Sequence, residues 1–112
     1  MKSPPGPRMT LPTQLVLRAL LDAPTREQYG LEICATAGLP SGTIYPILAR
    51  LEVAGWLVSR WEDVDPHERG RPRRRYYHLS SEGAERARNA LAQARSSVTS
   101  VARLRLAPGG VS

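Results

Sequence analysis

The stretch that decides the fold is residues 26–57, REQYGLEICATAGLPSGTIYPILARLEVAGWL. Its first part has the apolar spacing of a short helix over residues 26–37, which Gly38 ends because glycine readily takes the left-handed backbone of a helix C-terminus. A second helix opens at residues 40–41 and ends at Gly55. Two short helices joined by a tight turn that contains glycine are typical of a helix-turn-helix, whose second helix lies in the major groove of DNA.

One more helix is predicted ahead of this pair. Apolar side chains recur at helical spacing behind Thr10, a good N-cap residue, until Pro24 stops the pattern. Both ends of the chain, residues 1–9 and 108–112, are rich in proline or glycine, and we expect them to be disordered tails. The folded part is therefore expected to begin at residue 10.

The pattern after the helix pair is that of a β-hairpin. Residues alternate with period two over 57–61 and again over 76–79, which predicts two antiparallel strands. The loop between them, residues 62–74, is too charged for a core and is predicted to project into solvent as a wing. The expected fold is mainly α with a small antiparallel β-hairpin, a winged helix-turn-helix domain over residues 10–79.

Residues 80–107 predict the longest element, a C-terminal dimerisation helix of roughly 40 Å at 1.5 Å per residue. Its apolar side chains recur at alternating steps of three and four, the heptad pattern of paired helices. Packing on its own domain is the alternative, but a helix of this length would overhang a core of about 70 residues. The first helix is expected to join the same interface. The predicted dimerisation residues are Leu17, Leu21, Leu91, Ala94, Val98 and Val101.

The charge of the chain favours a polyanionic partner. Its 112 residues carry 16 Lys and Arg against 10 Asp and Glu, a formal net charge of +6. Nucleic acid and an anionic membrane surface are the candidates, but the longest uncharged stretch, residues 33–49, contains prolines and glycines that exclude a spanning helix. With one cysteine and no apolar leader, a cytoplasmic protein without a membrane partner is expected.

Two groups of residues are candidates for contact with double-stranded DNA. The first is the exposed face of the second helix of the pair, where small residues permit close approach and polar ones reach bases or phosphates. Its members are Ser41, Gly42, Thr43, Tyr45 and Arg50. This face alone fits an ordinary solvent-exposed helix equally well. The second group, on the wing, consists of Arg69, Arg71, Arg73, Arg74 and Arg75.

The arginine cluster favours the DNA interpretation, because cations this dense repel one another without an anionic partner. A solvated loop and a nuclear-import signal are the alternatives. Residues 69–72, Arg-Gly-Arg-Pro, also resemble the core of an AT-hook, an extended segment that lies in the minor groove. The acids of the loop oppose the cluster in sign and are expected to hold its shape or tune its affinity. These acids are Glu62, Asp63, Asp65 and Glu68.

No catalysis, metal or cofactor is predicted. His67 and His78 have no second group of ligands near them in the sequence, so a metal site is not expected. No nucleophile, base and orienting group occur together, so an enzyme is not expected. Cys34 lies among small apolar residues and is expected to be an inert side chain.

Three blocks of this sequence resemble the PadR family. They are YGLEI at residues 29–33, SGTIYP at 41–46 with LE and GWL behind it, and GRPRRRYYHLS at 70–80. The resemblance covers residues 15–90. It implies a bacterial transcription factor, usually a repressor, with an N-terminal winged helix and a C-terminal helix that makes a two-fold dimer. The single C-terminal helix is similar to the smaller branch of the family.

The resemblance also implies roles by position. It places Thr43 and Tyr45 on the reading helix at the DNA, and Arg73, Arg74 and Arg75 at the wing base near phosphates. Two departures stand out: Ser41 replaces a usual proline, and Leu31 replaces a common aromatic residue.

Several relatives bind flat aromatic compounds between their long helices. No aromatic residue follows Tyr77 in this chain, so such a pocket is not expected. A small-molecule effector would instead use Trp56, Trp61 or another interface.

The expected function is that of a homodimeric repressor. Each subunit would insert its reading helix into successive major grooves roughly 34 Å apart, so the operator would be an inverted repeat. Two alternatives remain open. A winged helix also serves as a protein-interaction adaptor, and an arginine run alone suffices for a sequence-indifferent nucleic-acid-binding protein.

Overall fold

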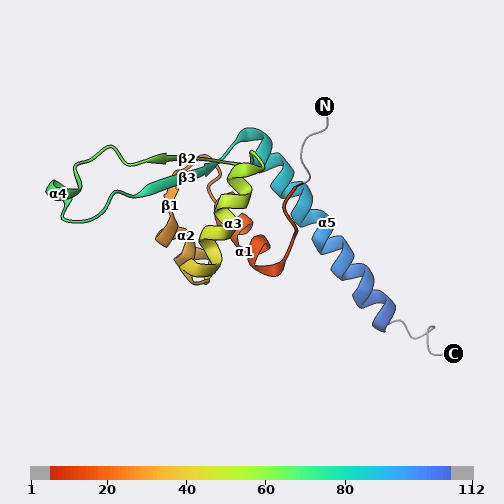
Figure 1. Ribbon diagram of the computed structural model, residues 1–112. Helices are drawn as coiled ribbons and strands as arrows, with labels where there is room; N and C mark the ends of the chain where they lie inside the picture. Colours follow the sequence, from red (N-terminus) through yellow and green to blue (C-terminus); the bar gives the residue numbers. More distant parts are fainter. Residues whose placement is uncertain (1–5, 107–112) are drawn as a thin grey trace.

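The computed structural model describes residues 6–106, with side chains up to residue 97. The elements in chain order are α1 (Leu11–Leu21), β1 (Gln28–Tyr29), α2 (Gly30–Ala37), α3 (Ser41–Val53), β2 (Leu57–Trp61), α4 (Pro66–Arg69), β3 (Arg75–Leu79) and α5 (Ser81–Leu106). Helices α1, α2 and α3 form the body; the β2–β3 hairpin extends to one side with α4 at its tip, and α5 leaves on the other side (Figure 1). This arrangement confirms the predicted fold class. No helix of the described part is long and apolar enough to cross a membrane.

Helix α1 begins at the predicted cap. The Thr13 amide donates to the Thr10 hydroxyl at 3.4 Å, and Pro12 fits the first turn, where no amide hydrogen is needed. The residue before the cap is also placed, because Met9 packs against the core and its carbonyl accepts a hydrogen bond from Gln14 Nε2 at 2.9 Å. Residues 6–9 thus belong to the folded body, contrary to the predicted tail. Residues 1–5 and the predicted tail at 108–112 lie outside the described residues.

Helix α2 begins at Gly30 rather than near residue 26. Gln28 and Tyr29 instead form β1, which pairs antiparallel with Tyr77 and Tyr76 of β3. The sheet therefore has three strands in the order β1-β3-β2, one more than predicted. A strand of two residues has no alternation that a sequence pattern can reveal, and only its pairing with β3 creates it.

The hydrophobic core lies between the first three helices, the sheet and the first half of α5. It consists of Val16, Leu17, Leu20, Ile33, Ile44, Ile47, Leu48, Leu51, Trp56, Leu57, Tyr77, Leu79, Ala84, Ala87 and Leu91. The α5 members occupy the predicted heptad positions of that helix. The first half of the predicted seam therefore packs on its own domain.

Two of the predicted dimerisation residues are corrected by this core. Leu17 has no exposed surface, so it cannot touch a second chain, and Leu91 is 9% exposed. A heptad stripe reports which face of a helix is buried and not which element buries it. Leu21 is partly buried and Ala94 half-buried, so both retain some surface, whereas Val98 and Val101 lie beyond the described side chains.

The first turn of α5 approaches the chain at Trp56 through a glycine. Gly83 is buried, and a Cβ atom there would lie 2.6 Å from Trp56 Cα and 2.7 Å from the carbonyl carbon of Trp56. Ser80 supports this approach, because its amide donates to the Trp56 carbonyl at 3.0 Å and its hydroxyl accepts from the Gly83 amide at 2.9 Å. The close approach requires glycine and anchors the long helix on the domain.

Candidate nucleic-acid interface

Helix α3 presents one apolar face to the core and one accessible face to solvent. Four side chains are buried: Ile44, Ile47, Leu48 and Leu51. The accessible face includes all but one of the residues predicted to read DNA; Thr43 is half-buried. A Cβ atom at Gly42 would meet no atom within 4 Å, so nothing in the described chain crowds the start of this face. Small residues on an uncrowded helix face allow close approach to the floor of a groove.

Tyr45 crosses from α3 to the start of α2. Its ring occupies the space that Gly30 leaves: a Cβ atom at Gly30 would lie 2.6 Å from Cζ and 2.7 Å from Cε1 of Tyr45. The side chain is nevertheless 43% exposed. Packing therefore fixes the position of this ring while leaving one side of it accessible to a partner.

Glu62 closes the base of the wing. Its carboxylate accepts two hydrogen bonds from the Arg71 guanidinium, at 2.7 and 3.1 Å, and one from the Arg74 amide at 3.3 Å. The Tyr76 hydroxyl adds a fourth at 3.4 Å. The Arg71 hydrogen bond is the main reason why the pKa of Glu62 falls from its ordinary value of 4.5 to about 2. The guanidinium of Arg71 is consequently held inside the protein's own hydrogen-bond network.

The resemblance to an AT-hook is wrong. Residues 66–69 form the single turn α4, which Asp65 caps by accepting from the His67 amide at 2.9 Å. Gly70 then reverses the chain with φ of 69°. The segment is therefore folded rather than extended. Local hydrogen bonds and the Glu62 contact override the extended conformation that the motif needs.

Arg75 is the first residue of β3 and Arg74 comes directly before it, and the two side chains contact different elements. The Arg74 guanidinium lies 4.1 Å from the centroid of the Tyr29 ring. Arg75 donates to the Ser59 hydroxyl at 3.1 Å and to the Glu52 carboxylate at 3.3 Å. Each of these arginines is thus positioned by residues of another element.

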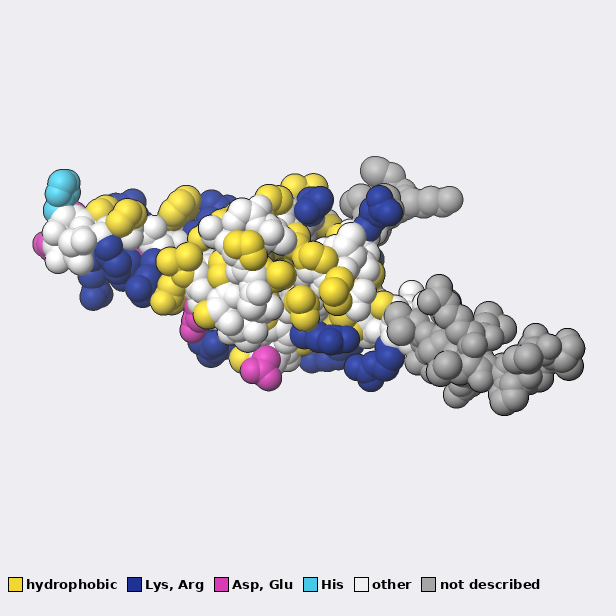
Figure 2. Space-filling model, turned by 90° about the horizontal axis from the view of Figure 1, so that it is seen from below, with side chains coloured by type: hydrophobic (Ala, Val, Ile, Leu, Met, Phe, Trp, Pro, Cys, Tyr) yellow, Lys and Arg dark blue, Asp and Glu magenta, His cyan; other side chains and the backbone are white. Residues whose placement is uncertain are grey.

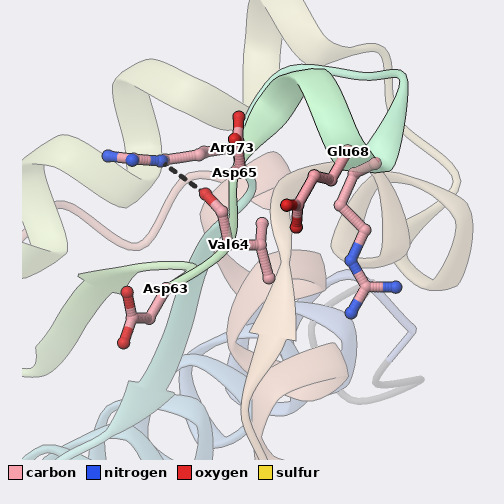
Figure 3. A pocket seen from close by; sticks show the side chains of 6 residues that line it. Asp63, Val64, Asp65, Glu68 and Arg73 are labelled. Carbon is pink, nitrogen blue, oxygen red and sulfur yellow. Dashed lines mark hydrogen bonds between the residues drawn. The ribbon is translucent and has the colours of Figure 1, made fainter.

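Arg69 and Arg73 are exposed and form no ion pair among the described residues. Arg73 donates its Nε hydrogen to the Val64 carbonyl at 2.9 Å (Figure 3). Both arginines border a hollow of about 820 Å³ that the carboxylates of the loop also line. Figure 2 shows Arg side chains, in dark blue, gathered along the wing and in further groups on the helical body. These two arginines are the wing residues most available to an anion.

The sequence model that describes the PadR-like family of transcriptional regulators matches residues 17–89 of this chain, which include α2, α3, the sheet and the wing. This chain belongs to that family. The match confirms the resemblance found in the sequence. No curated protein matches the chain at a significant level.

Solved structures share the fold of this PadR-like regulator. The protein smu.1704 of Streptococcus mutans UA159 is 25% identical with a TM-score of 0.63, over 85% of this chain and 90% of that one. A PadR family regulator of Clostridium difficile R20291 is 23% identical with a TM-score of 0.66, over 85% and 98%. AbfR, solved in an overoxidised form bound to DNA, is 27% identical with a TM-score of 0.60. That match covers 80% of this chain and 60% of AbfR.

The two tryptophans of the PadR-like regulator lie in different surroundings. Trp56 is 5% exposed and belongs to the core, whereas Trp61 is 58% exposed at the base of the wing. The Arg75 guanidinium lies 5.2 Å from the centroid of the Trp61 ring. Trp61 therefore helps to position a wing arginine.

The residues that hold the wing arginines were not predicted from the sequence. Glu52 and Tyr29 come from α3 and β1, distant in sequence from the wing, and no local pattern links them to it. Glu62 carried one signal, because an acid inside a basic loop suggests an ion pair. Which arginine it pairs with depends on the folded path of the loop.

The Glu62→Gln variant is expected to loosen the wing. Glutamine keeps the shape of the side chain but loses the charge that holds Arg71. Both Glu62→Gln and Glu68→Gln remove one negative charge, so the loss of wing shape appears as the difference between them. We expect Glu62→Gln to bind a random-sequence duplex about fivefold more weakly than Glu68→Gln, since a charge-assisted hydrogen bond is roughly twice as strong as a neutral one. Fluorescence anisotropy at low salt measures this change, with Glu68→Gln, an exposed acid of the same loop, as the matched control.

The acid dependence of stability gives the second readout for Glu62. Because its pKa is lowered on folding, its stabilisation is complete above about pH 4.5 and is lost as the pH falls toward 2. The difference in melting temperature between the wild type and Glu62→Gln should therefore shrink across that window. A difference that stays constant down to pH 2 would contradict the role given to this carboxylate.

Proposed function

We propose that this PadR-like regulator is a homodimeric repressor that binds an inverted-repeat operator in double-stranded DNA. The observation that carries the proposal is the combination of an exposed α3 face with a wing whose arginines are already positioned. A helix of this size fits the major groove, which is about 12 Å wide, and a wing of this kind reaches the flanking backbone or minor groove. AbfR, which shares this fold, is solved bound to DNA.

The proposed reading residues have distinct tasks. Tyr45 and Thr43 face base edges or nearby phosphates from α3, where Ser41 and Gly42 permit close approach. Arg69 and Arg73 supply exposed positive charge at the wing, with Arg73 oriented by its hydrogen bond to the Val64 carbonyl. Phosphate contacts of this kind position a protein on the duplex, and base contacts give it specificity.

The proposed dimer uses the second half of α5. This helix has 26 residues and leaves the body on the side away from the wing (Figure 1). An isolated helical extension is marginally stable in water, so a second copy of the helix is the natural partner for it. Ala94, Val98 and Val101 are the proposed contacts, with Leu21 at their edge.

Repression would be steric, because an occupied operator blocks a promoter. The protein would act in the cytoplasm, where bacterial DNA lies. A small-molecule effector would act through the long helices by changing the distance between the two reading helices.

Selection of bound fragments from random duplex DNA tests the proposal. At physiological salt the purified protein should enrich an inverted repeat whose half-sites lie about one helical turn apart. Light scattering should give the mass of two chains for the free protein. Tight binding without an enriched sequence would instead support the sequence-indifferent function, and absence of binding would favour the adaptor.

A further inference from the structure

A small pocket separates the N-terminal segment from helix α3. It has a volume of about 360 Å³ and is lined by Gly6, Pro7, Arg8, Thr10, Thr13, Ile47 and Arg50. Two of the seven lining residues are arginines, and none of the seven is acidic. Neither Arg8 nor Arg50 forms an ion pair within the part of the chain that the structure describes. The pocket is therefore a place where positive charge converges without an internal partner.

The backbone on both sides of Arg8 is held in place. Met9 packs against the core, and its carbonyl accepts a hydrogen bond from Gln14 Nε2 at 2.9 Å. On the far side, a Cβ atom at Gly6 would lie 3.0 Å from the Trp56 ring, so the segment passes close to that ring. The Arg8 side chain is exposed, but its backbone is anchored on both sides. Less conformational entropy is therefore lost when Arg8 binds an anion.

The hydroxyl groups in the pocket add a donor. Thr10 and Thr13 share one hydrogen bond of 2.9 Å between their Oγ1 atoms. Two hydroxyl groups carry two hydrogens, and their mutual bond uses one of them. Thr10 is exposed, so when Thr13 donates this bond the hydrogen of the Thr10 hydroxyl is available to a phosphate oxygen.

We propose that Arg8, Arg50 and this pair of threonines form a second phosphate-binding site for the DNA backbone. The site rests on the proposed DNA-binding function and extends it to the N-terminal segment. Arg50 lies on the edge of the exposed face of α3 opposite Tyr45, because five residues rotate a helix by about 140°. The N-terminal segment and the wing lie on opposite sides of α3 (Figure 1). With α3 in the major groove, the wing and the Arg8–Arg50 site would hold the phosphate backbones that border the groove.

The test compares Arg8→Gln, Arg50→Gln and the double variant with a matched control. The control is Arg88→Gln, which removes the same charge from an exposed position on α5 outside the pocket. Affinity for the duplex enriched by the wild type is measured between about 50 and 300 mM salt. The plot of log affinity against log salt has a negative slope, to which each phosphate contact contributes about −0.9. Each single variant should therefore make the slope less steep by roughly one. At physiological salt each should bind about fivefold more weakly, with the same base preference.

The outcomes separate the site from the proposed function. If the wild type binds the duplex while Arg8→Gln and Arg50→Gln keep the slope of the Arg88→Gln control, the phosphate site is overturned and the proposed function stands. If Arg50→Gln changes the preferred bases and leaves the slope unchanged, Arg50 reads bases and the assignment fails. A wild type that binds no duplex would overturn both. The melting temperature of each variant should equal that of the wild type, which shows that weaker binding comes from a lost contact and not from unfolding.

Discussion

The Gly83→Ala variant is expected to lose about 3 kcal/mol or more of its free energy of unfolding, the range of severe packing defects. The added methyl group would overlap the backbone of Trp56, and a backbone cannot rotate away as a flexible side chain can. Helix α5 would have to shift, which would pull Ala84 and Ala87 out of the core. Urea unfolding followed by tryptophan fluorescence, at one fixed protein concentration, measures the loss.

The matched control for this prediction is Gly42→Ala. It makes the same chemical change in a helix, but at a position where the new methyl group meets no atom within 4 Å. Alanine is favoured over glycine in a helix interior by about 0.5–1 kcal/mol, so this variant should be as stable as the wild type or more so. Equal stability of both variants would show that α5 is not seated on Trp56 as described.

The Tyr45→Ala variant is expected to lose at least tenfold in affinity for the enriched operator, while binding to random-sequence DNA changes little. A specific contact at a base edge is worth about 1–3 kcal/mol, or about 5- to 150-fold in affinity, and the fixed position of this ring favours the upper part of that range. Fluorescence anisotropy with the two duplexes measures both quantities. Val53→Ala, a truncation on the same helix at a side chain that is 86% exposed, is the control and should stay within twofold.

A second variant tests whether recognition depends on the position of the Tyr45 ring as well as on its presence. Gly30→Ala leaves the tyrosine intact but fills the space that the ring occupies. Because a side chain can move aside, we expect nearly normal stability together with weakened recognition of the operator. If both Tyr45→Ala and Gly30→Ala retain the selectivity of the wild type, Tyr45 does not read DNA.

The bounds of the main elements followed from local chemistry. The reading helix was expected between residues 40–41 and Gly55, and α3 runs from Ser41 to Val53. Likewise the strands were expected at 57–61 and 76–79, and β2 and β3 occupy residues 57–61 and 75–79. Caps, glycine and proline act within a few residues, so a sequence pattern records them directly.

Longer-range pairings could not be predicted in this way. Strand β1 exists only through its pairing with β3, and Leu17 is buried by its own domain although its helical stripe fits a dimer equally well. An apolar stripe indicates that one face of a helix is buried. It does not indicate whether the element that packs against this face belongs to the same chain or to another one.

The primary structure alone was sufficient to define the helix-turn-helix, the wing and the family, because these depend on local spacing and on motifs at fixed distances. The tertiary structure decided which arginines are available. It holds Arg71 on Glu62 and Arg75 on Glu52, leaves Arg69 and Arg73 exposed, and places Arg8 and Arg50 at one pocket. The physical reason is that the availability of a charge depends on its partners in space, and those partners come from distant parts of the chain.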